Sequence, residues 1–188
     1  MKFPKLLMFA LAVVVVGQLA IPVGMILRRE GTLREGKALK FRTQPVDPYD
    51  AFRGRYVALS LEPNSVTLVT NVTYEYRSRL YIALEEGPDG FVRVSGVSAE
   101  PPKDKDYVKV TTLWRDQNKL HVQWPFDRFY MEESKAPAAE RAYREHSRRG
   151  KQDAYVIVRV RNGMGVIENL FVADKPMAEF LRAETQAK

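Results

Sequence analysis

The longest apolar run in the chain lies near its N-terminus, where residues 6–27 contain no charged side chain. At about 1.5 Å per residue, a helix over this run is about 33 Å long, enough for a hydrocarbon core of about 30 Å. A cleavable signal peptide has a shorter apolar region of about 7–15 residues and small residues at the cleavage site. Gln18, Leu19 and Ala20 match that site poorly. The pattern therefore favours a retained anchor over residues 1–28.

Downstream of the anchor the pattern has the period of β-strands. Residues 55–61 place Val57, Leu59 and Leu61 on one apolar face, as in a half-buried strand. Two turn sequences, residues 87–90 and 162–163, predict hairpins. We therefore expect a mostly β (α+β) fold, an antiparallel sandwich or partly closed barrel. The predicted strands are residues 37–43, 55–61, 65–76, 79–86, 91–98, 107–115, 119–124, 153–161 and 165–172.

Two segments after the anchor have a helical pattern. Residues 137–149 are Ala-rich, with acids early, arginines late and Gly150 as a stop signal, which predicts one helix inserted among the strands. A short tail helix is predicted from Asp174. The expected organisation is an anchor (1–28), a polar linker with Gly31 and Gly36 (29–37), a β-rich domain (38–173) and a tail (174–188).

Residues 45–62, the signature stretch, combine a turn rich in acids with the start of a strand. Pro48 fixes its own φ and pushes Asp47 into extended geometry, and Asp50 can cap the backbone that follows. Gly54 separates the turn from the strand, where a positive φ or a close backbone approach is the usual reason for Gly. We therefore expect Gly54 to be the least replaceable residue of the turn.

The signature stretch resembles that of the GDYXXLXY family of uncharacterised bacterial membrane-anchored proteins, whose pattern is roughly D-P-x-D-x-x-x-G-D-Y-x-x-L-x-Y. Arg55 and Leu61 stand where that pattern has Asp and Tyr. The RFYMEE stretch (residues 128–133) and residues 154–172 are similar to two further parts of the family, so the resemblance covers residues 38–172. It implies no activity that can be carried over. The matching residues are Asp47, Pro48, Asp50, Gly54, Tyr56 and Leu59.

One cluster of side chains is a candidate for chemistry. Asp47, Asp50 and Arg53 would form a site with Glu133 if the fold brings the RFYMEE stretch beside the signature turn. The alternative is a structural corner, in which Asp50 caps the backbone and Asp47 pairs with Arg53. Two carboxylates alone do not indicate acid–base catalysis, because it depends on their pKa values and separation. We favour the corner and keep both hypotheses.

Composition narrows the range of chemistry. The net charge of +7 favours contact with anionic lipid or nucleic acid, but the charges are dispersed and no nucleic-acid motif is present, so we expect no nucleic-acid partner. The absence of Cys excludes disulfides and thiolate sites. His121 and His146 lack the spacing of a metal motif. We expect neither a metal nor a cofactor.

The charges that flank the apolar run bear on orientation. Taken literally, the positive-inside rule places the domain in the cytoplasm, because Lys2 and Lys5 precede the run and six cations follow it. A short basic N-terminus before an apolar run is, however, how an export signal begins, and long domains translocate largely regardless of charge. We expect a single-span protein of the bacterial inner membrane with a periplasmic domain. The six cations are Arg28, Arg29, Arg34, Lys37, Lys40 and Arg42.

Two functional hypotheses follow. The lack of a recognisable catalytic constellation favours a membrane-anchored interaction or assembly module that contacts another envelope protein through its sheet and its basic helix. The competing hypothesis is an envelope hydrolase-like enzyme using Asp47, Asp50, Arg53 and Glu133, and convergence of these side chains in an open pocket would favour it. An aromatic cluster belongs either to the core or to a partner surface; it comprises Trp114, Trp124, Phe126, Phe129 and Tyr130.

Overall fold

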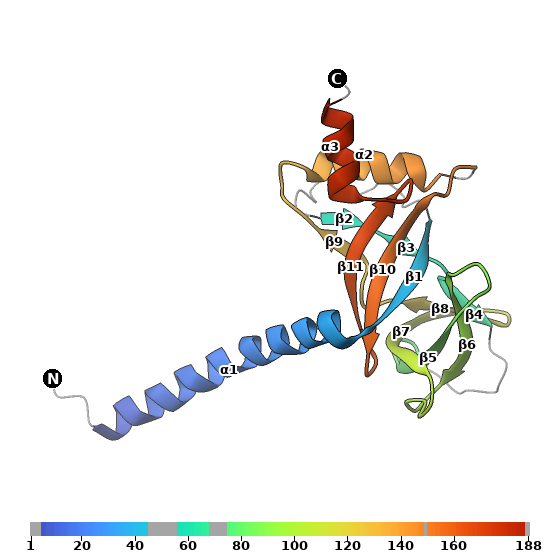
Figure 1. Ribbon diagram of the computed structural model, residues 1–188. Helices are drawn as coiled ribbons and strands as arrows, with labels where there is room; N and C mark the ends of the chain where they lie inside the picture. Colours follow the sequence, from blue (N-terminus) through green and yellow to red (C-terminus); the bar gives the residue numbers. More distant parts are fainter. Residues whose placement is uncertain (1–4, 45–55, 68–74, 149, 187–188) are drawn as a thin grey trace.

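The computed structural model of the protein describes residues 5–44, 56–67, 75–148 and 150–186. A long helix leads into a β-rich body that carries two shorter helices (Figure 1). Asp47, Pro48, Asp50, Arg53 and Gly54 lie outside the described residues. The elements are α1 (Lys5–Glu35), β1 (Lys37–Gln44), β2 (Tyr56–Ala58), β3 (Ser60–Leu61), β4 (Ser65–Thr67), β5 (Arg79–Glu86), β6 (Val92–Ser98), β7 (Asp106–Asp116), β8 (Lys119–Gln123), β9 (Arg128–Tyr130), α2 (Ala136–His146), β10 (Ala154–Arg161), β11 (Met164–Val172), β12 (Lys175–Pro176) and α3 (Met177–Gln186).

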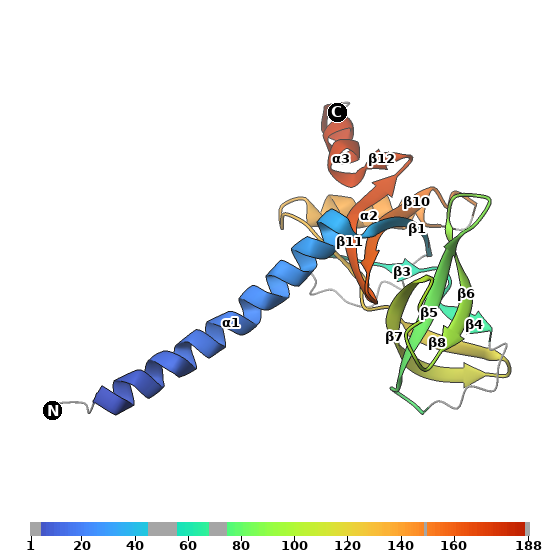
Figure 2. The same cartoon turned by 60° about the horizontal axis from the view of Figure 1, so that its bottom comes forward.

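The strands form three antiparallel sheets, which confirms the mostly β prediction. One sheet has the order β12-β11-β10-β1-β3, and β2 pairs with β9 alone. The third sheet, β4-β8-β7-β5-β6, curves into a nearly closed barrel (Figure 2). Helix α2 is the inserted helix that the sequence predicts, and α3 is the tail helix.

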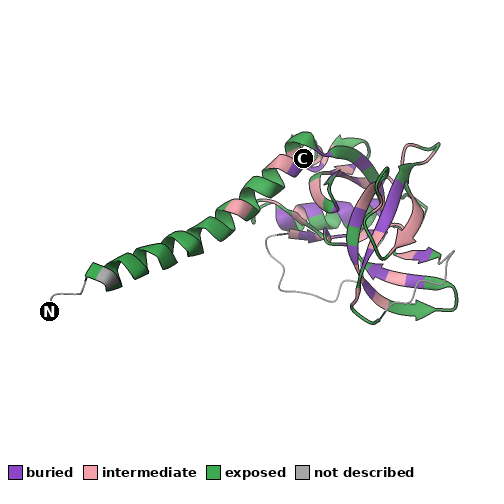
Figure 3. Ribbon diagram, turned by 90° about the horizontal axis from the view of Figure 1, so that it is seen from below, coloured by how far each residue is buried: buried purple, intermediate pink, exposed green. Residues whose placement is uncertain are grey.

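Alternating apolar residues build one core between the sheets. Ala154, Val156, Val158 and Val160 are buried on β10, as the period of a half-buried strand requires. Phe41 of β1 is fully buried and meets the rings of Trp124 and Phe126 edge-on, with both centroid distances 5.4 Å. Burial is concentrated in the body, whereas most of α1 is exposed (Figure 3).

The hairpins follow from their turn residues. Asn162 and Gly163 have φ angles of 49° and 80°, the pair of positive values that a two-residue hairpin requires. The β5–β6 turn is closed by the amide of Gly87, which donates to the carbonyl of Phe91 at 2.8 Å. Both predicted hairpins are confirmed.

Helix α1 extends through most of the predicted linker, because residues 29–35 are helical, and the strand begins at Lys37 as predicted. Arg34 pairs with Glu30 one turn earlier at 2.8 Å. Thr32 is buried, and its hydroxyl donates to the carbonyl of Arg28 at 3.0 Å. Gly31 alone does not stop a helix whose neighbours favour it. Docking of the last turn on the body supplies the remaining stabilisation.

Other boundaries differ where partners distant in sequence decide them. The strand predicted over residues 55–61 is divided, because β2 pairs with β9 whereas β3 pairs with β1. The strand predicted over 65–76 does not reach its end, since Tyr76 lies in a turn with Arg77 at a φ of 60°. Helix α2 ends at His146 instead of Arg149, and α3 begins at Met177 because Ala173 and Asp174 form a turn with positive φ.

Candidate functional site

The fold brings the RFYMEE stretch beside the signature strand. In the β2–β9 pair, Tyr56 lies opposite Tyr130 and Ala58 lies opposite Arg128. The two tyrosine rings are 5.5 Å apart, and the Arg128 guanidinium lies 5.1 Å from the centre of the Tyr56 ring. A hydrogen bond with Tyr130 raises the pKa of Arg128. Val57 is fully buried on the opposite face. The RFYMEE stretch thus lies beside the signature strand, whereas its position relative to the signature turn stays a prediction because the turn lies outside the described residues.

Only part of the candidate cluster can be placed. Glu133 is exposed in the segment between β9 and α2, where its carbonyl accepts the amide of Ala136 at 3.3 Å. Its proposed partners Asp47, Asp50 and Arg53 lie outside the described residues. Their convergence, and with it the choice between a site and a structural corner, stays a prediction. Leu59 of the signature is buried, and its amide donates to the carbonyl of Asp127 at 2.9 Å.

A buried tyrosine on α2 connects the two ends of the signature. The Tyr143 hydroxyl donates to the carbonyl of Gln44 at 2.8 Å and accepts from the amide of Ser60 at 3.4 Å. Burial raises the pKa of Tyr143 to about 12. Sequence reasoning did not single out this residue. The available signal was one large side chain among the alanines of an amphipathic helix, which marks the face that packs.

A groove lies where the barrel stays open. It has a volume of about 830 Å³ and is lined by both edge strands, β4 and β6, together with the turn between β3 and β4. The ends of the signature form one wall, since the Gln44 amide donates to the Glu62 carboxylate at 2.7 Å. Asn64 donates in turn to Gln44 at 3.4 Å. Hydrogen bonds thus join the residues at the two ends of the signature, and these residues line the groove.

Charged groups meet at the rim of this groove. Arg42 pairs with Asp89 at 3.2 Å, and its guanidinium lies 3.9 Å from the centre of the Phe91 ring. Arg93 approaches the same carboxylate at 3.8 Å. The hydrogen bond from Arg42 lowers the pKa of Asp89, so this carboxylate stays ionised at neutral pH. The rim pairs opposite charges instead of presenting a field of one sign.

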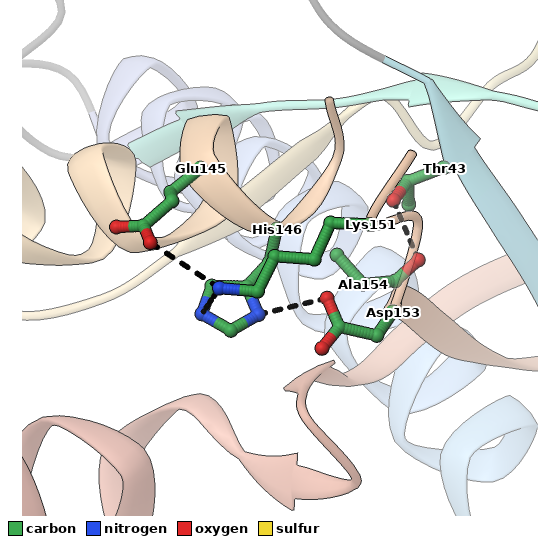
Figure 4. Close-up of polar contacts among 6 residues, drawn as sticks. All are labelled: Thr43, Glu145, His146, Lys151, Asp153 and Ala154. Atoms are coloured by element: carbon green, nitrogen blue, oxygen red, sulfur yellow. Dashed lines mark hydrogen bonds and ion pairs between the residues drawn. The ribbon is translucent and has the colours of Figure 1, made fainter. Parts of the chain in front are cut away.

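His146 is held in a polar cluster at the end of α2 (Figure 4). Its Nδ1 lies 2.8 Å from a carboxylate oxygen of Asp153, and its Nε2 lies 3.2 Å from Nζ of Lys151. Because the ammonium can only donate, Nε2 accepts and Nδ1–H donates to Asp153. Lys151 also pairs with Glu145 at 3.2 Å, and Phe180 of α3 covers the ring edge-on. These contacts fix the α2–β10 connection.

The histidines do not form a metal centre in the described part of the chain. His121 stacks on Trp114 at 4.6 Å. Across residues 5–44, 56–67, 75–148 and 150–186, no group of three or more His, Cys, Asp or Glu side chains is placed to hold a metal ion.

The aromatic cluster divides between core and surface. Trp124 and Phe126 are buried, and Phe129 packs against the core. Trp114 and Tyr130 are 58% and 64% exposed, so the core interpretation holds for three of the five residues and leaves two at the surface.

The described residues include one helix, Leu7–Glu35, that is long and apolar enough to cross a membrane, and none of its apolar window is buried in the body. An N-terminal signal sequence has the same properties. Comparisons with curated proteins and with solved structures found no significant match. A protein-family profile described as "GDYXXLXY protein" matches residues 18–170, from the second half of the apolar helix to β11. Since this match covers most of the chain, the protein belongs to the GDYXXLXY family.

Proposed function

We propose that the protein is a membrane-anchored interaction module that binds an extended segment of another envelope protein in the groove between β4 and β6. One observation carries this proposal. Within the described residues, β4 and β6 each have a strand neighbour on one side only, and both line the same groove. Exposed strand edges present unpaired amides and carbonyls that pair with added strands.

The directions of the strands define what fits. Every neighbouring pair in the β4-β8-β7-β5-β6 sheet is antiparallel, so β4 and β6 run in the same direction. A single strand inserted between them in the opposite direction would form antiparallel ladders on both sides. It would also close the barrel, which removes both edges. The groove therefore suits one extended peptide.

The lining indicates the sequence of that peptide. Val66 is buried, and Val94 and Val97 are partly buried against the core, whereas the rim carries Arg42 and Asp89. Because side chains alternate between the faces of a strand, the bound segment would carry apolar residues at every second position. Lys40 of β1 forms an isolated bridge with Phe91, the residue before β6.

Photocrosslinking in cells tests this proposal. A benzoylphenylalanine at Ser95, which lines the groove, should crosslink to an extended segment of a partner, whereas the same probe at exposed Trp114 should not. A synthetic peptide of the crosslinked segment should protect the amides of β4 and β6 from hydrogen exchange, and Ser95→Lys should abolish that protection. Thr111→Lys on the central strand β7 is the matched control. Crosslinks from Ser95 to this chain's own residues 68–74 would contradict the proposal.

For the location, we infer that α1 spans the inner membrane and that the body lies on the periplasmic side. The length of its apolar run supports spanning, and the order of basic and apolar residues supports export. The chain has no Cys, so Trp114→Cys introduces a single thiol at an exposed site. A membrane-impermeant maleimide should label this thiol in intact spheroplasts. Labelling only after lysis would place the body in the cytoplasm.

A further inference from the structure

The end of α1 contacts the β10–β11 hairpin of the body. Glu35 pairs with Arg161 at 2.7 Å, and the carbonyl of Gly36 accepts a hydrogen bond from Arg159 at 3.2 Å. The buried Thr32 contacts the sulfur of Met164 at 3.5 Å. The helix and the β10–β11 hairpin therefore meet where α1 leaves its apolar run.

The position of Arg29 sets the depth of a second pocket. Arg29 is two residues beyond the apolar run that ends at Leu27, which is about 3 Å along a helix. The headgroup layer on each side of a bilayer is about 5–7.5 Å thick, since the bilayer measures about 40–45 Å in total and its hydrocarbon core about 30 Å. If α1 spans the membrane as proposed, Arg29 lies in the headgroup layer.

Arg29 lines a juxtamembrane pocket of about 420 Å³, together with residues 125–130 and 165–168. Of the lining residues, Phe126 is buried, and Phe129 and Ile167 pack against the core. Tyr130, 64% exposed, also lines it. Apolar walls with tyrosine at the mouth are what the boundary between hydrocarbon and headgroups favours.

Two exposed guanidinium groups, those of Arg29 and Arg128, line this pocket together with the carboxylates of Asp127 and Glu168. Arg29 forms no ion pair with the described residues. Arg128 bonds with Tyr130 and lies 5.1 Å from the centre of the Tyr56 ring. It also contacts Asp127 at 3.5 Å, in a pair whose side chains are both nearly half exposed, and such exposed pairs are weak. The carboxylate of Glu168 is already occupied by Arg159 through two bonds of 2.7 and 3.1 Å. Guanidinium groups bind phosphate oxygens through paired hydrogen bonds.

We propose that the juxtamembrane pocket binds the phosphodiester headgroup of a membrane glycerophospholipid, with Arg29 and Arg128 contacting the phosphate. The acyl chains remain in the bilayer beside α1, and the glycerol side of the headgroup meets Phe129 and Tyr130. This proposal rests on the membrane anchoring proposed above but not on the β4–β6 groove. A lipid is the expected source of the phosphodiester because the pocket opens at headgroup depth, where lipid is present at high local concentration.

The test is native mass spectrometry of the full chain in non-ionic detergent, titrated with phosphatidylglycerol. We expect one tightly bound lipid. Arg29→Gln or Arg128→Gln should each weaken its binding about tenfold, the effect of losing one charge-assisted hydrogen bond. Arg34→Gln on the same helix and Arg144→Gln on α2 are matched controls, since both arginines are exposed and paired with glutamates, and they should change binding less than twofold.

A thermal melt provides the second measurement. A ligand that binds only the folded state raises the melting temperature, so phosphatidylglycerol should stabilise the wild-type chain and the two controls but not the Arg29→Gln/Arg128→Gln double variant. The double variant should fold, because both side chains are exposed. Retention of wild-type affinity by a folded double variant would overturn the proposal.

Two further experiments are needed. One distinguishes a membrane lipid from a soluble phosphodiester as the ligand, and the other tests the lipid proposal separately from the groove proposal. Water-soluble glycerophosphoglycerol carries the same phosphodiester without acyl chains, and binding as tight as that of the lipid would overturn the assignment to a membrane lipid. Ser95→Lys should leave lipid binding unchanged, and the arginine variants should leave crosslinking from the groove unchanged. Failure of one proposal therefore remains distinguishable from failure of the other.

Discussion

Removing the hydroxyl of Tyr143 tests whether α2 holds the ends of the signature stretch. Tyr143→Phe keeps the buried ring but deletes the bond to the carbonyl of Gln44 at 2.8 Å and the longer contact with the amide of Ser60 at 3.4 Å. A neutral hydrogen bond contributes about 0.5–1.5 kcal/mol, and a buried group left without its partner adds about 1–3 kcal/mol. We expect a loss of about 2 kcal/mol at neutral pH. For a chain of this size, that lowers the melting temperature by about 4–8 °C.

The pH dependence gives a sharper version of this prediction. Burial raises the pKa of Tyr143 from 10.0 to about 12. As the pH rises, the Tyr143 phenol therefore ionises in the unfolded chain before it ionises in the folded chain, and this shifts the equilibrium toward unfolding. The stabilisation from the neutral phenol is fully present below pH 10 and is lost progressively between pH 10 and 12. Two pKa units correspond to about 2.7 kcal/mol. Tyr143→Phe lacks this titration, so the wild type should lose its advantage near pH 12.

Urea unfolding of the full chain in non-ionic detergent, followed by circular dichroism at pH 8, 10, 11 and 11.5, measures the gap in unfolding free energy. The difference between the two chains removes the contribution of the other tyrosines to the pH dependence, since the variant retains all of them. A gap that is constant from pH 8 to 11.5 would refute the buried, hydrogen-bonded phenol. A variant as stable as the wild type at pH 8 would refute the role of Tyr143 in holding the signature.

Three other predictions concern packing, anchoring and the signature turn. At Gly165 a Cβ would meet the ring of Phe126, so Gly165→Ala should cost about 1–3 kcal/mol by overpacking in a thermal melt, whereas Gly96→Ala, whose nearest contact would be at 4.0 Å, is the control and should melt near the wild type. Deleting residues 1–28 should release a soluble, folded, β-rich domain, and a deletion product that stays membrane-integral after a carbonate wash would imply a second insertion element. From the sequence alone, Gly54→Val should cost about 1 kcal/mol or more and Arg55→Asp less than about 0.5 kcal/mol, and the opposite order of melting temperatures would mean that charged side chains hold the turn.

The parts of the fold that the sequence predicts are those determined by short-range patterns of residues. The alternation on β10 and the turn pair at residues 162–163 predict that hairpin because burial on one face and two positive φ values have short-range signatures. The burial of Val57, Leu59 and Leu61 also follows from alternation alone. Alternation does not say which strands pair, however, so it could not predict that β2 and β3 enter different sheets.

The missed features depend on contacts between residues far apart in the sequence. The last turn of α1 is helical where it contacts the body, through Thr32 with Met164 and Glu35 with Arg161. The residues around Gly31 do not indicate that these contacts will form. The candidate site shows the same limit. The RFYMEE stretch was identified as relevant to the signature, yet the groove and the contact of Tyr143 with Gln44 arise only once three sheets and a helix have packed.

The position of the signature stretch explains why its residues resist assignment to one site. Its first neighbour, Gln44, forms part of the groove wall with Glu62. Its strand residue Tyr56 contacts Arg128, which lines the juxtamembrane pocket. The described residues on the two sides of the signature turn therefore lie at different candidate sites, Gln44 at the groove and Tyr56 beside the juxtamembrane pocket. For any substitution in the signature, binding should therefore be measured at both the groove and the juxtamembrane pocket. A change in binding measured at one site alone does not show which site the substitution affects.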